Sequence, residues 1–177
     1  MRKNLLFWIL MAIMAAGVFA CHNLQQFNNS WDAADKTLEN SQAPGFILAN
    51  LAGEDISLAD FHGNVVLLNF WTTWCPYCKL DLPVMDSLYV KYKEKGFVVL
   101  AVNVTALEKT TGAVEKVIAE NDYSFPVLLD KTGDVALKYE ATAFPTSFII
   151  NQRGEIVYSK IGSFSAKEME AIVKKLL

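Results

Sequence analysis

The sequence contains few cysteines and histidines, three and two respectively among 177 residues. A small secreted domain that is held together by disulfides needs more cysteines than this. A closed structural zinc site needs four ligands, whereas the chain offers one CxxC pair and two histidines, His22 and His62, that are far apart. The composition therefore excludes a disulfide-rich scaffold and a structural zinc domain.

Clusters of positive charge are also absent. The net charge is −3, and the lysines of segment 91–95 are interspersed with Tyr92 and Glu94, as is typical of a solvated helix face. Proteins that bind nucleic acids gather Lys and Arg against the phosphates, so we expect no nucleic-acid partner. The length and a hydrophobic content of 53% suffice for one domain with a buried core, together with some targeting sequence.

The N-terminal segment is unlike the rest of the chain. Arg2 and Lys3 precede an apolar run over 5–19, and small residues lie near its end, which is typical of a secretory signal. The residues before Cys21 resemble a bacterial lipobox, in which the cysteine is lipidated and becomes the mature N-terminus. An uncleaved membrane anchor is the alternative, although the run is slightly shorter than the ~20 residues needed to span. Both versions place the remainder outside the cytoplasm, beside a membrane.

Three regions follow from this pattern: a signal peptide over 1–20, a lipid-anchored tether over 21–43 and a folded domain over 44–177. The tether is polar and lacks the apolar periodicity of a core element. In the domain, apolar and turn patterns predict strands at 46–51, 55–58, 65–71, 97–104, 125–129, 147–151 and 155–161, and helices at 76–95, 108–121, 134–139 and 165–177. Continuous apolar strands separated by helices indicate a mainly parallel sheet covered on both faces, with an antiparallel hairpin at the end of the chain.

The CxxC pair lies at a predicted junction between a strand and a helix. Cys75 and Cys78 follow the apolar run 65–71, and Cys75 stands at the expected N-cap, with Pro76 at the first helical position. Free N–H groups and the positive end of the helix dipole favour an anion at such a junction. We therefore predict a redox pair in which Cys75 is the attacking thiol and Cys78 the resolving thiol.

Four segments resemble one family of redox proteins. They are Asn69-Phe-Trp-Thr-Thr-Trp-Cys-Pro-Tyr-Cys-Lys-Leu-Asp-Leu-Pro83, Val99-Leu-Ala-Val-Asn-Val104, Phe125-Pro-Val-Leu-Leu-Asp130 and Phe144-Pro-Thr-Ser-Phe-Ile-Ile-Asn151. Together they resemble the membrane-tethered thiol-disulfide oxidoreductases of the ResA/TlpA type, in the thioredoxin superfamily close to the AhpC/TSA branch. The resemblance covers 44–177 and implies a thioredoxin-like α/β fold: a central mixed sheet with helices on both faces, an extra N-terminal hairpin, and a helix-strand insert between Glu108 and Leu129.

The resemblance also implies an activity and partners. It implies a protein-disulfide reductase whose only redox group is the Cys75–Cys78 pair, without a cofactor, and whose clients are proteins such as apocytochrome c. A membrane electron carrier of the CcdA or DsbD kind would re-reduce the pair. We expect a monomer that is held at the membrane through Cys21. The sequence itself leaves open the direction of electron transfer between the pair and its client, because the same motif can reduce or oxidise depending on its redox potential.

The resemblance further assigns a surface for the client. Trp74, Pro76 and Tyr77 flank the cysteines, and Pro145 matches a cis-proline that faces the CxxC turn. A cis bond there would expose the Phe144 backbone, with which a client peptide could pair as an additional strand. Without the resemblance, an ordinary trans proline at the start of an edge strand is favoured.

Two acidic residues are candidates for tuning the thiols. Asp81 follows Cys78 by three residues, so the two are helical neighbours, and a carboxylate there could raise the thiol pKa and accept the Cys78 proton. Family members often carry Glu at this place, and the alternative is a solvated acid that favours the early helix. Glu108 is the second candidate, by resemblance to an acid after the Val-Asn-Val strand, and we expect it to begin the helix 108–121.

Two other functions stay open. A pair of exposed thiolates suits Cu(I), and some proteins of this fold carry copper, but the sequence offers no obvious third ligand. Thr72 lies three residues before Cys75, which is the Thr-x-x-Cys spacing of thiol peroxidases. We favour dithiol chemistry because Cys78 would react with any sulfenic acid formed at Cys75.

Overall fold

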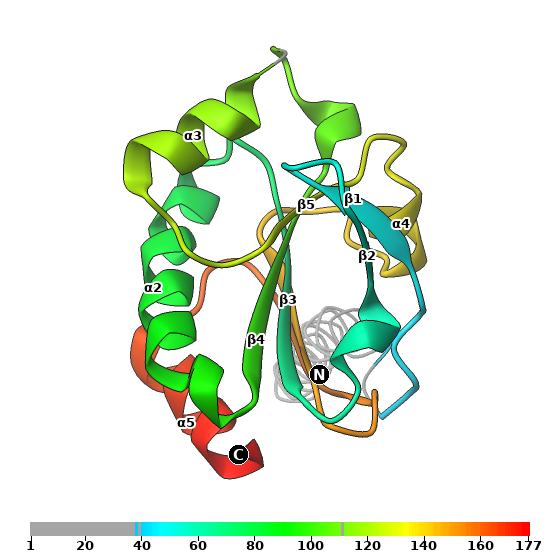
Figure 1. Ribbon diagram of the computed structural model, residues 1–177, viewed down its shortest axis with the longest axis vertical. Coiled ribbons are helices and arrows are strands. Elements are labelled where there is room, and N and C mark those ends of the chain that lie inside the picture. Colours follow the sequence, from blue (N-terminus) through cyan, green and yellow to red (C-terminus); the bar gives the residue numbers. More distant parts are fainter. Residues whose placement is uncertain (1–37, 39, 111) are drawn as a thin grey trace, which may run out of the picture. The chain divides into compact units, whose positions relative to one another are not determined.

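The computed structural model describes residue 38 and residues 40–110 and 112–177 (Figure 1). The predicted signal peptide, most of the predicted tether and Cys21 lie outside the described residues. Within the described residues, no helix is both long enough and apolar enough to cross a membrane.

Strands and helices alternate along the described chain much as the sequence pattern predicts. The strands are β1 (Ile47–Asn50), β2 (Asp55–Ser57), β3 (Val65–Trp71), β4 (Phe97–Asn103), β5 (Val127–Leu129), β6 (Thr146–Ile150) and β7 (Ile156–Ile161). The α-helices are α2 (Pro76–Tyr92), α3 (Ala113–Asn121), α4 (Asp134–Lys138) and α5 (Ala166–Leu176). Short 3₁₀ turns are η1 (Leu58–Phe61), η2 (Lys93–Lys95) and η3 (Thr105–Leu107).

The strands form one sheet in the order β2-β1-β5-β4-β3-β6-β7. β3 pairs in parallel with β4, and β4 with β5, whereas the other four pairs are antiparallel. The sheet is therefore mixed, as the resemblance implies. The interpretation of a mainly parallel sheet overestimates the parallel share, because the hairpin strand β6 pairs directly with the central strand β3.

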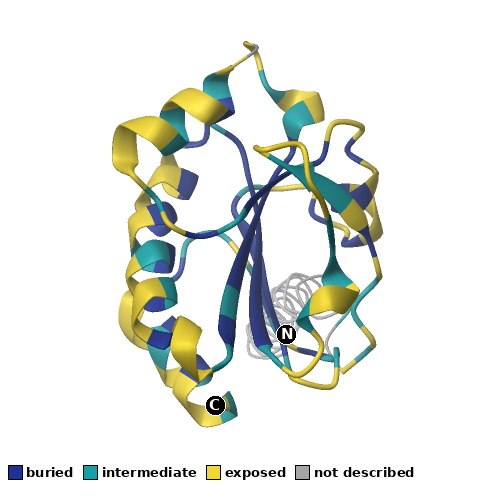
Figure 2. Ribbon diagram, in the orientation of Figure 1, coloured by how far each residue is buried: buried dark blue, intermediate teal, exposed yellow. Residues whose placement is uncertain are grey.

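The central strand β3 separates two hydrophobic cores. All seven of its residues are buried, and alternate side chains project to opposite faces. Val65, Leu67 and Trp71 pack with residues of α2, α3 and α5, whereas Val66 and Leu68 pack with α4 and the β1–β2 hairpin. Figures 1 and 2 show α2, α3 and α5 on one side of the central strands and α4 on the other. The prediction of helices on both faces is confirmed.

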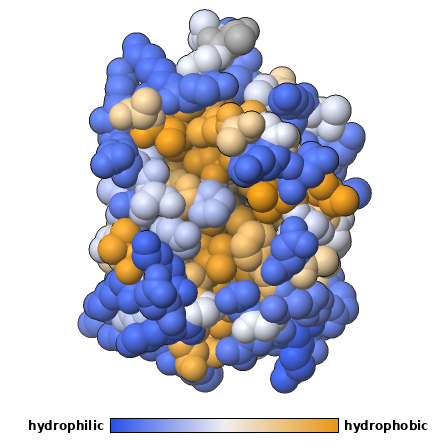
Figure 3. Space-filling model, viewed as in Figure 1, coloured by the Kyte–Doolittle hydropathy of each residue, from blue (hydrophilic) through white to orange (hydrophobic). Residues whose placement is uncertain are grey.

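The surface follows the same division. In the space-filling view from the same side, apolar side chains gather along the middle, where Figure 1 places the central strands, and polar side chains cover both margins (Figure 3). The helices thus turn their polar faces to solvent, as amphipathic helices on a buried sheet must.

The predicted helix 108–121 is wrong in its first turn. α3 begins at Ala113, and its N-cap Gly112 has a φ of 78°, in the left-handed region that glycine adopts readily. Glu108 itself is extended, with φ −71° and ψ 143°, at the end of η3. Glu108 therefore lies in the connection between β4 and α3 and does not begin a helix.

Residues 40–43, at the end of the predicted tether, lie against the turn between β6 and β7 and the first residue of β7. The Asn40 N–H donates to the Ile156 carbonyl oxygen at 2.8 Å, and the Ala43 N–H donates to the Gly154 carbonyl oxygen at 2.8 Å. Gly154 lies in the turn between β6 and β7, at the end of the sheet where β3 starts. The chain therefore enters the sheet at the end opposite to the CxxC pair.

Tyr139 fixes this entry from the second core. Its ring is 1% exposed, and the ring centroids of Phe46, Phe70 and Phe148 lie 6.2, 5.3 and 5.2 Å away. The hydroxyl donates to the Pro44 carbonyl oxygen at 2.8 Å, and burial raises the pKa of this hydroxyl. One side chain thereby connects the end of α4 with the first residues of the domain.

Tyr139→Phe should lower the free energy of unfolding by about 1 to 2 kcal/mol, because the Pro44 carbonyl oxygen loses its donor while the ring still fills its site. Urea denaturation measures the difference. Tyr89→Phe is the matched control, since the Tyr89 hydroxyl makes no hydrogen bond with the described residues. Equal stability of the two variants would contradict this role of Tyr139.

Candidate active site

Cys75 is the N-cap of α2, where β3 has just ended. Its backbone is extended, with φ −81° and ψ 113°, and its Sγ accepts the Cys78 N–H at 3.1 Å. The sulfur thus takes the position that a serine or aspartate oxygen occupies at other helix starts. This N–H and the positive end of a 17-residue helix favour a negative charge on the Cys75 sulfur.

Cys75 and Cys78 form a disulfide, with their Cα atoms 5.3 Å apart. Both residues are nearly buried, with exposed fractions of 3% and 1%. A partner must therefore contact the residues around the disulfide in order to reach it.

Exposed apolar side chains lie near the pair, and we call them the apolar rim. Its members are Trp74, Tyr77, Leu80 and Leu107, with exposed fractions of 43, 63, 63 and 50%. The Trp74 indole N–H donates to the Leu107 carbonyl oxygen at 3.0 Å, and its ring meets the Phe144 ring edge-on at 6.4 Å. Pro76, at the first position of α2, is exposed as well.

The turn before β6 lies against the same sulfur. The Phe144–Pro145 peptide bond is cis, as the resemblance implies. The Phe144 carbonyl oxygen lies 3.5 Å from the Cys75 Sγ, and the Gly162 N–H donates to the Pro145 carbonyl oxygen at 2.7 Å. Pro145 is buried and Phe144 partly exposed. The backbone of the turn before β6 therefore lies against the Cys75 side chain at the start of α2.

Asp81 is buried one turn after Cys78. It is 1% exposed, and burial raises the pKa of its carboxyl to about 6, against the effects of hydrogen bonds with the Ser163 side chain and the Phe164 backbone and of the Lys160 charge. Its Oδ2 has no hydrogen-bond partner within the described residues. The alternative of a solvated acid is therefore wrong. A carboxyl with this pKa can bind and release a proton near neutral pH.

Glu108 acts on the loop that precedes the cysteines. Its carboxylate accepts the Thr73 backbone N–H at 2.7 Å, the Thr73 hydroxyl, and the Asn103 side-chain amide at 2.7 Å. Thr73 is two residues before Cys75, and Asn103 ends β4. Glu108 thus joins the C-terminal ends of β3 and β4, and it reaches the site through Thr73.

The segment 162–164 is part of the site, although no local sequence pattern predicts its place there. The Gly162 N–H donates to the Pro145 carbonyl oxygen at 2.7 Å, and the Ser163 hydroxyl donates to the Tyr77 carbonyl oxygen at 3.2 Å. In the sequence, Gly162 indicates only that a turn follows the strand, and its φ of 92° agrees with such a turn. A glycine does not indicate which residues lie next to that turn in the fold.

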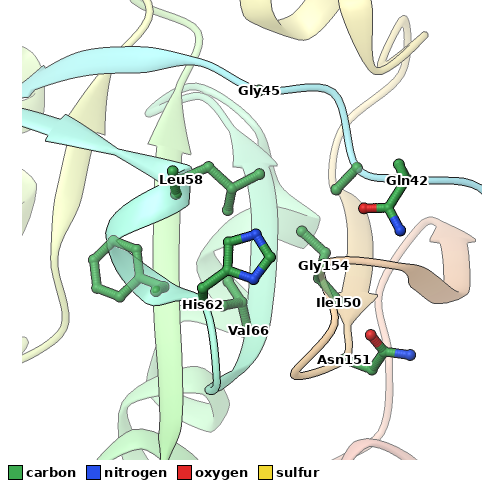
Figure 4. A pocket seen from close by; sticks show the side chains of 11 residues that line it. Gln42, Gly45, Leu58, His62, Val66, Ile150, Asn151 and Gly154 are labelled. Atoms are coloured by element: carbon green, nitrogen blue, oxygen red, sulfur yellow. The ribbon is translucent and has the colours of Figure 1, made fainter.

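A separate pocket of about 110 Å³ lies at the other end of the sheet (Figure 4). Leu58, Val66 and Ile150 line it with apolar side chains, and His62 and Gln42 contribute polar groups. No cluster of three or more His, Cys, Asp or Glu side chains that could hold a metal occurs in the part of the chain that the structure describes. The pocket is remote from the disulfide, since Val66 is near the start of β3.

Comparisons with known proteins agree with this geometry. The AhpC/TSA family model matches residues 40–159. The thiol-disulfide oxidoreductase ResA of Bacillus cereus is 34% identical over 177 residues, which is 99% of this chain and 99% of that protein.

Solved structures show the same fold. StoA from Bacillus subtilis matches with a TM-score of 0.65 at 35% identity, covering 73% of this chain and 96% of that chain. The exposed lipoprotein thioredoxin Etrx1 from Streptococcus pneumoniae matches with a TM-score of 0.67 at 27% identity, covering 75% of this chain and 100% of that chain. The full-length match to a thiol-disulfide oxidoreductase, together with the family model, shows that this chain belongs to the AhpC/TSA family, among the ResA-type thiol-disulfide oxidoreductases of the thioredoxin fold.

Proposed function

We propose that the protein reduces protein disulfides outside the cytoplasm, with Cys75 as the attacking thiol and Cys78 as the resolving thiol. The observation that supports these roles is the difference between the two sulfurs. The Cys75 Sγ accepts the Cys78 N–H at the start of α2, whereas Cys78 lies inside the first turn. A thiolate is therefore favoured at Cys75, and the thiolate is the form that attacks a disulfide.

The reaction proceeds in two exchanges. The Cys75 thiolate attacks one sulfur of the client disulfide, so that a Cys75–client disulfide forms and the other client sulfur leaves as a thiolate. Cys78 then attacks the Cys75 sulfur, and the second client sulfur leaves. Two electrons pass from the dithiol to the client, and the Cys75–Cys78 disulfide is the oxidised product.

Asp81 serves the second exchange. Cys78 must lose its thiol proton in order to attack, and Asp81 is its neighbour one turn along α2. With a pKa of about 6, the buried carboxyl is largely ionised at neutral pH and can accept that proton. Glu108 supports the site by holding Thr73 in place, not by proton transfer.

The client binds on the apolar rim. Its exposed side chains suit an unfolded segment that presents apolar residues of its own. The backbone next to Pro145 offers hydrogen-bonding groups beside Cys75, so the client chain can lie along it as an extra strand. Apocytochrome c before haem attachment is a client of this kind.

The proposed location rests on the sequence before residue 38 and on one relative. The charged start, the apolar run and Cys21 fit a lipidated N-terminus, and Etrx1 is described as an exposed lipoprotein. Outside the cytoplasm the thiol pools of the cytosol are out of reach, so re-reduction requires electrons from a membrane dithiol carrier of the CcdA or DsbD kind. We propose that the protein acts as a monomer at that membrane.

Cys78→Ala should trap the client, because the mixed disulfide at Cys75 can no longer be resolved. We expect a reductant-sensitive adduct on non-reducing gels, with the linkage at Cys75 found by mass spectrometry. The Cys75→Ala/Cys78→Ala double variant is the control and should trap nothing. Transfer of Cu(I) by the native protein, without any trapped client in Cys78→Ala, would support the copper-transfer alternative instead.

The redox potential decides the direction of transfer. We expect a value near that of thioredoxin, about −270 mV, and far from that of DsbA, about −120 mV. Equilibration with glutathione buffers, followed by tryptophan fluorescence, measures it. A value close to the DsbA potential would identify an oxidant.

Asp81→Asn should slow the second exchange about 10- to 100-fold at pH 7, because Cys78 loses its proton acceptor, while the first exchange keeps its rate. Rapid mixing with a small aromatic disulfide separates the two exchanges. Equal slowing of both would point to damage of the CxxC turn and not to a lost base.

The same substitution should stabilise the fold above pH 6. Since burial raises the Asp81 pKa from 3.8 to about 6, the ionised carboxylate opposes folding, and this effect disappears well below a pH of 3.8, where the group is protonated in both states. We compare the free energy of unfolding of Asp81→Asn with that of the native protein at two pH values. The difference between the two proteins should favour the variant by about 2 to 3 kcal/mol more at pH 8 than at pH 4. An identical difference at both pH values would contradict the raised pKa.

A further inference from the structure

A lysine that the steps above do not use lies on the same face of the sheet as Asp81. Lys160 of β7 is in register with Ser147 of β6, which is in register with Asn69 of β3. Residues in register on neighbouring strands project to one face, and this face is the one that packs against α2 and α5. The Lys160 side chain therefore extends into the layer in which Asp81 is buried.

Lys160 is held there by α5. Its Nζ lies 2.9 Å from each carboxylate oxygen of Glu168, and the Tyr158 hydroxyl donates to the same carboxylate at 2.8 Å. Glu168 is also the third residue of α5 and closes a capping box with Ser165. The ammonium group thus has a defined position, and its side chain is only 29% exposed.

Lys160 interacts with two acidic side chains, one by direct contact and one through its charge alone. It pairs directly with Glu168, and its charge also favours the ionised form of Asp81. Among the described residues, the titratable groups near Asp81 include Cys78 on its own helix, Lys160 from β7 and, behind Lys160, Glu168 from α5 and the Tyr158 hydroxyl that bonds it. The side chains that β3 contributes to this layer, Asn69 among them, are uncharged.

We propose that the Lys160–Glu168 pair sets the pH range over which Asp81 accepts the Cys78 proton. Lys160 is a positioning residue that favours the carboxylate, and Glu168 limits this effect by sharing the charge. The inference rests on the proton-accepting role of Asp81 proposed above. Removal of the lysine and removal of the glutamate should therefore change the pH dependence in opposite directions, which a purely structural pair would not do.

The test uses the full chain with Cys21→Ser, so that only the catalytic thiols react. Reduced protein is mixed with dithiobis(nitrobenzoate) from pH 5 to 8. The first thionitrobenzoate released reports attack by Cys75, and the second reports attack by Cys78 on the mixed disulfide. The proton of Cys78 passes to Asp81 in this second release.

Lys160→Met should slow the second release about two- to threefold at pH 6 and leave it unchanged at pH 8, where Asp81 is ionised in both proteins. Glu168→Gln should accelerate it at pH 6, by at most about twofold, because a group with a pKa of about 6 is already half ionised there. In the oxidised proteins, the carbon-13 carboxyl titration of Asp81 should move up in the first variant and down in the second.

Lys174→Met is the matched control. It breaks a comparable Lys–Glu pair on α5, Lys174 with Glu170 at 3.1 Å, and should change neither rate. If Lys160→Met or Glu168→Gln leaves the pH dependence unchanged while Asp81→Asn still slows the second release, the inference is wrong and the role of Asp81 stands. If Asp81→Asn has no effect, the proposed role of Asp81 fails. If Lys160→Met does not fold, Glu168→Gln, which retains Lys160, still tests the inference. A second release that is faster at pH 6 supports it, and an unchanged rate contradicts it.

Discussion

The chemistry of this protein depends on one contact, the Cys78 N–H against the Cys75 sulfur at the start of α2. Its position is fixed from both sides. β3 is buried along its whole length and cannot shift without uncovering apolar side chains, and α2 packs against the same core through residues such as Leu82 and Met85. The sulfur therefore sits where a helix has backbone donors to offer, and a reactive thiol results from the junction of two ordinary elements.

The proposed second exchange also requires a proton acceptor that changes its protonation state near neutral pH. Burial supplies this, because a carboxyl with little hydration holds its proton more tightly. The surroundings keep the effect within bounds: Ser163 and Phe164 bond the Asp81 carboxyl, and the charge of Lys160 favours its ionised form. A residue that weakens the fold at neutral pH is retained here where it can serve the reaction, which is common at active sites.

Much of this arrangement could be predicted from local patterns. The apolar run 65–71, the CxxC pair and Pro76 indicate a strand, an N-cap and a helix within one short stretch, and the helix predicted at 165–177 is present as α5. Neighbours that come from distant segments could not be predicted in this way. The predicted terminal hairpin places the strand of Lys160 beside β6, but nothing in the sequence indicates that β6 pairs in turn with β3 and so brings Lys160 to the layer in which Asp81 is buried.

Other differences have local causes. The start of α3 depends on the left-handed backbone of Gly112, and a polar segment before it gave no sign that Glu108 would instead bond Thr73 and Asn103. The cis form of the bond before Pro145 followed only from the family resemblance, since base rates favour trans. Sequence periodicity identifies elements and their buried faces, whereas the pairing of side chains across the sheet is a property of the assembled fold.

The entry of the chain at residues 40–43 has a mechanical consequence. These residues lie against the turn between β6 and β7, while the disulfide lies beyond the other end of β3, about 20 Å away if the seven residues of that strand are counted at strand rise. The point at which the chain enters the domain and the disulfide therefore lie at opposite ends of β3. A contact made at residues 40–43 leaves the disulfide and the apolar rim uncovered.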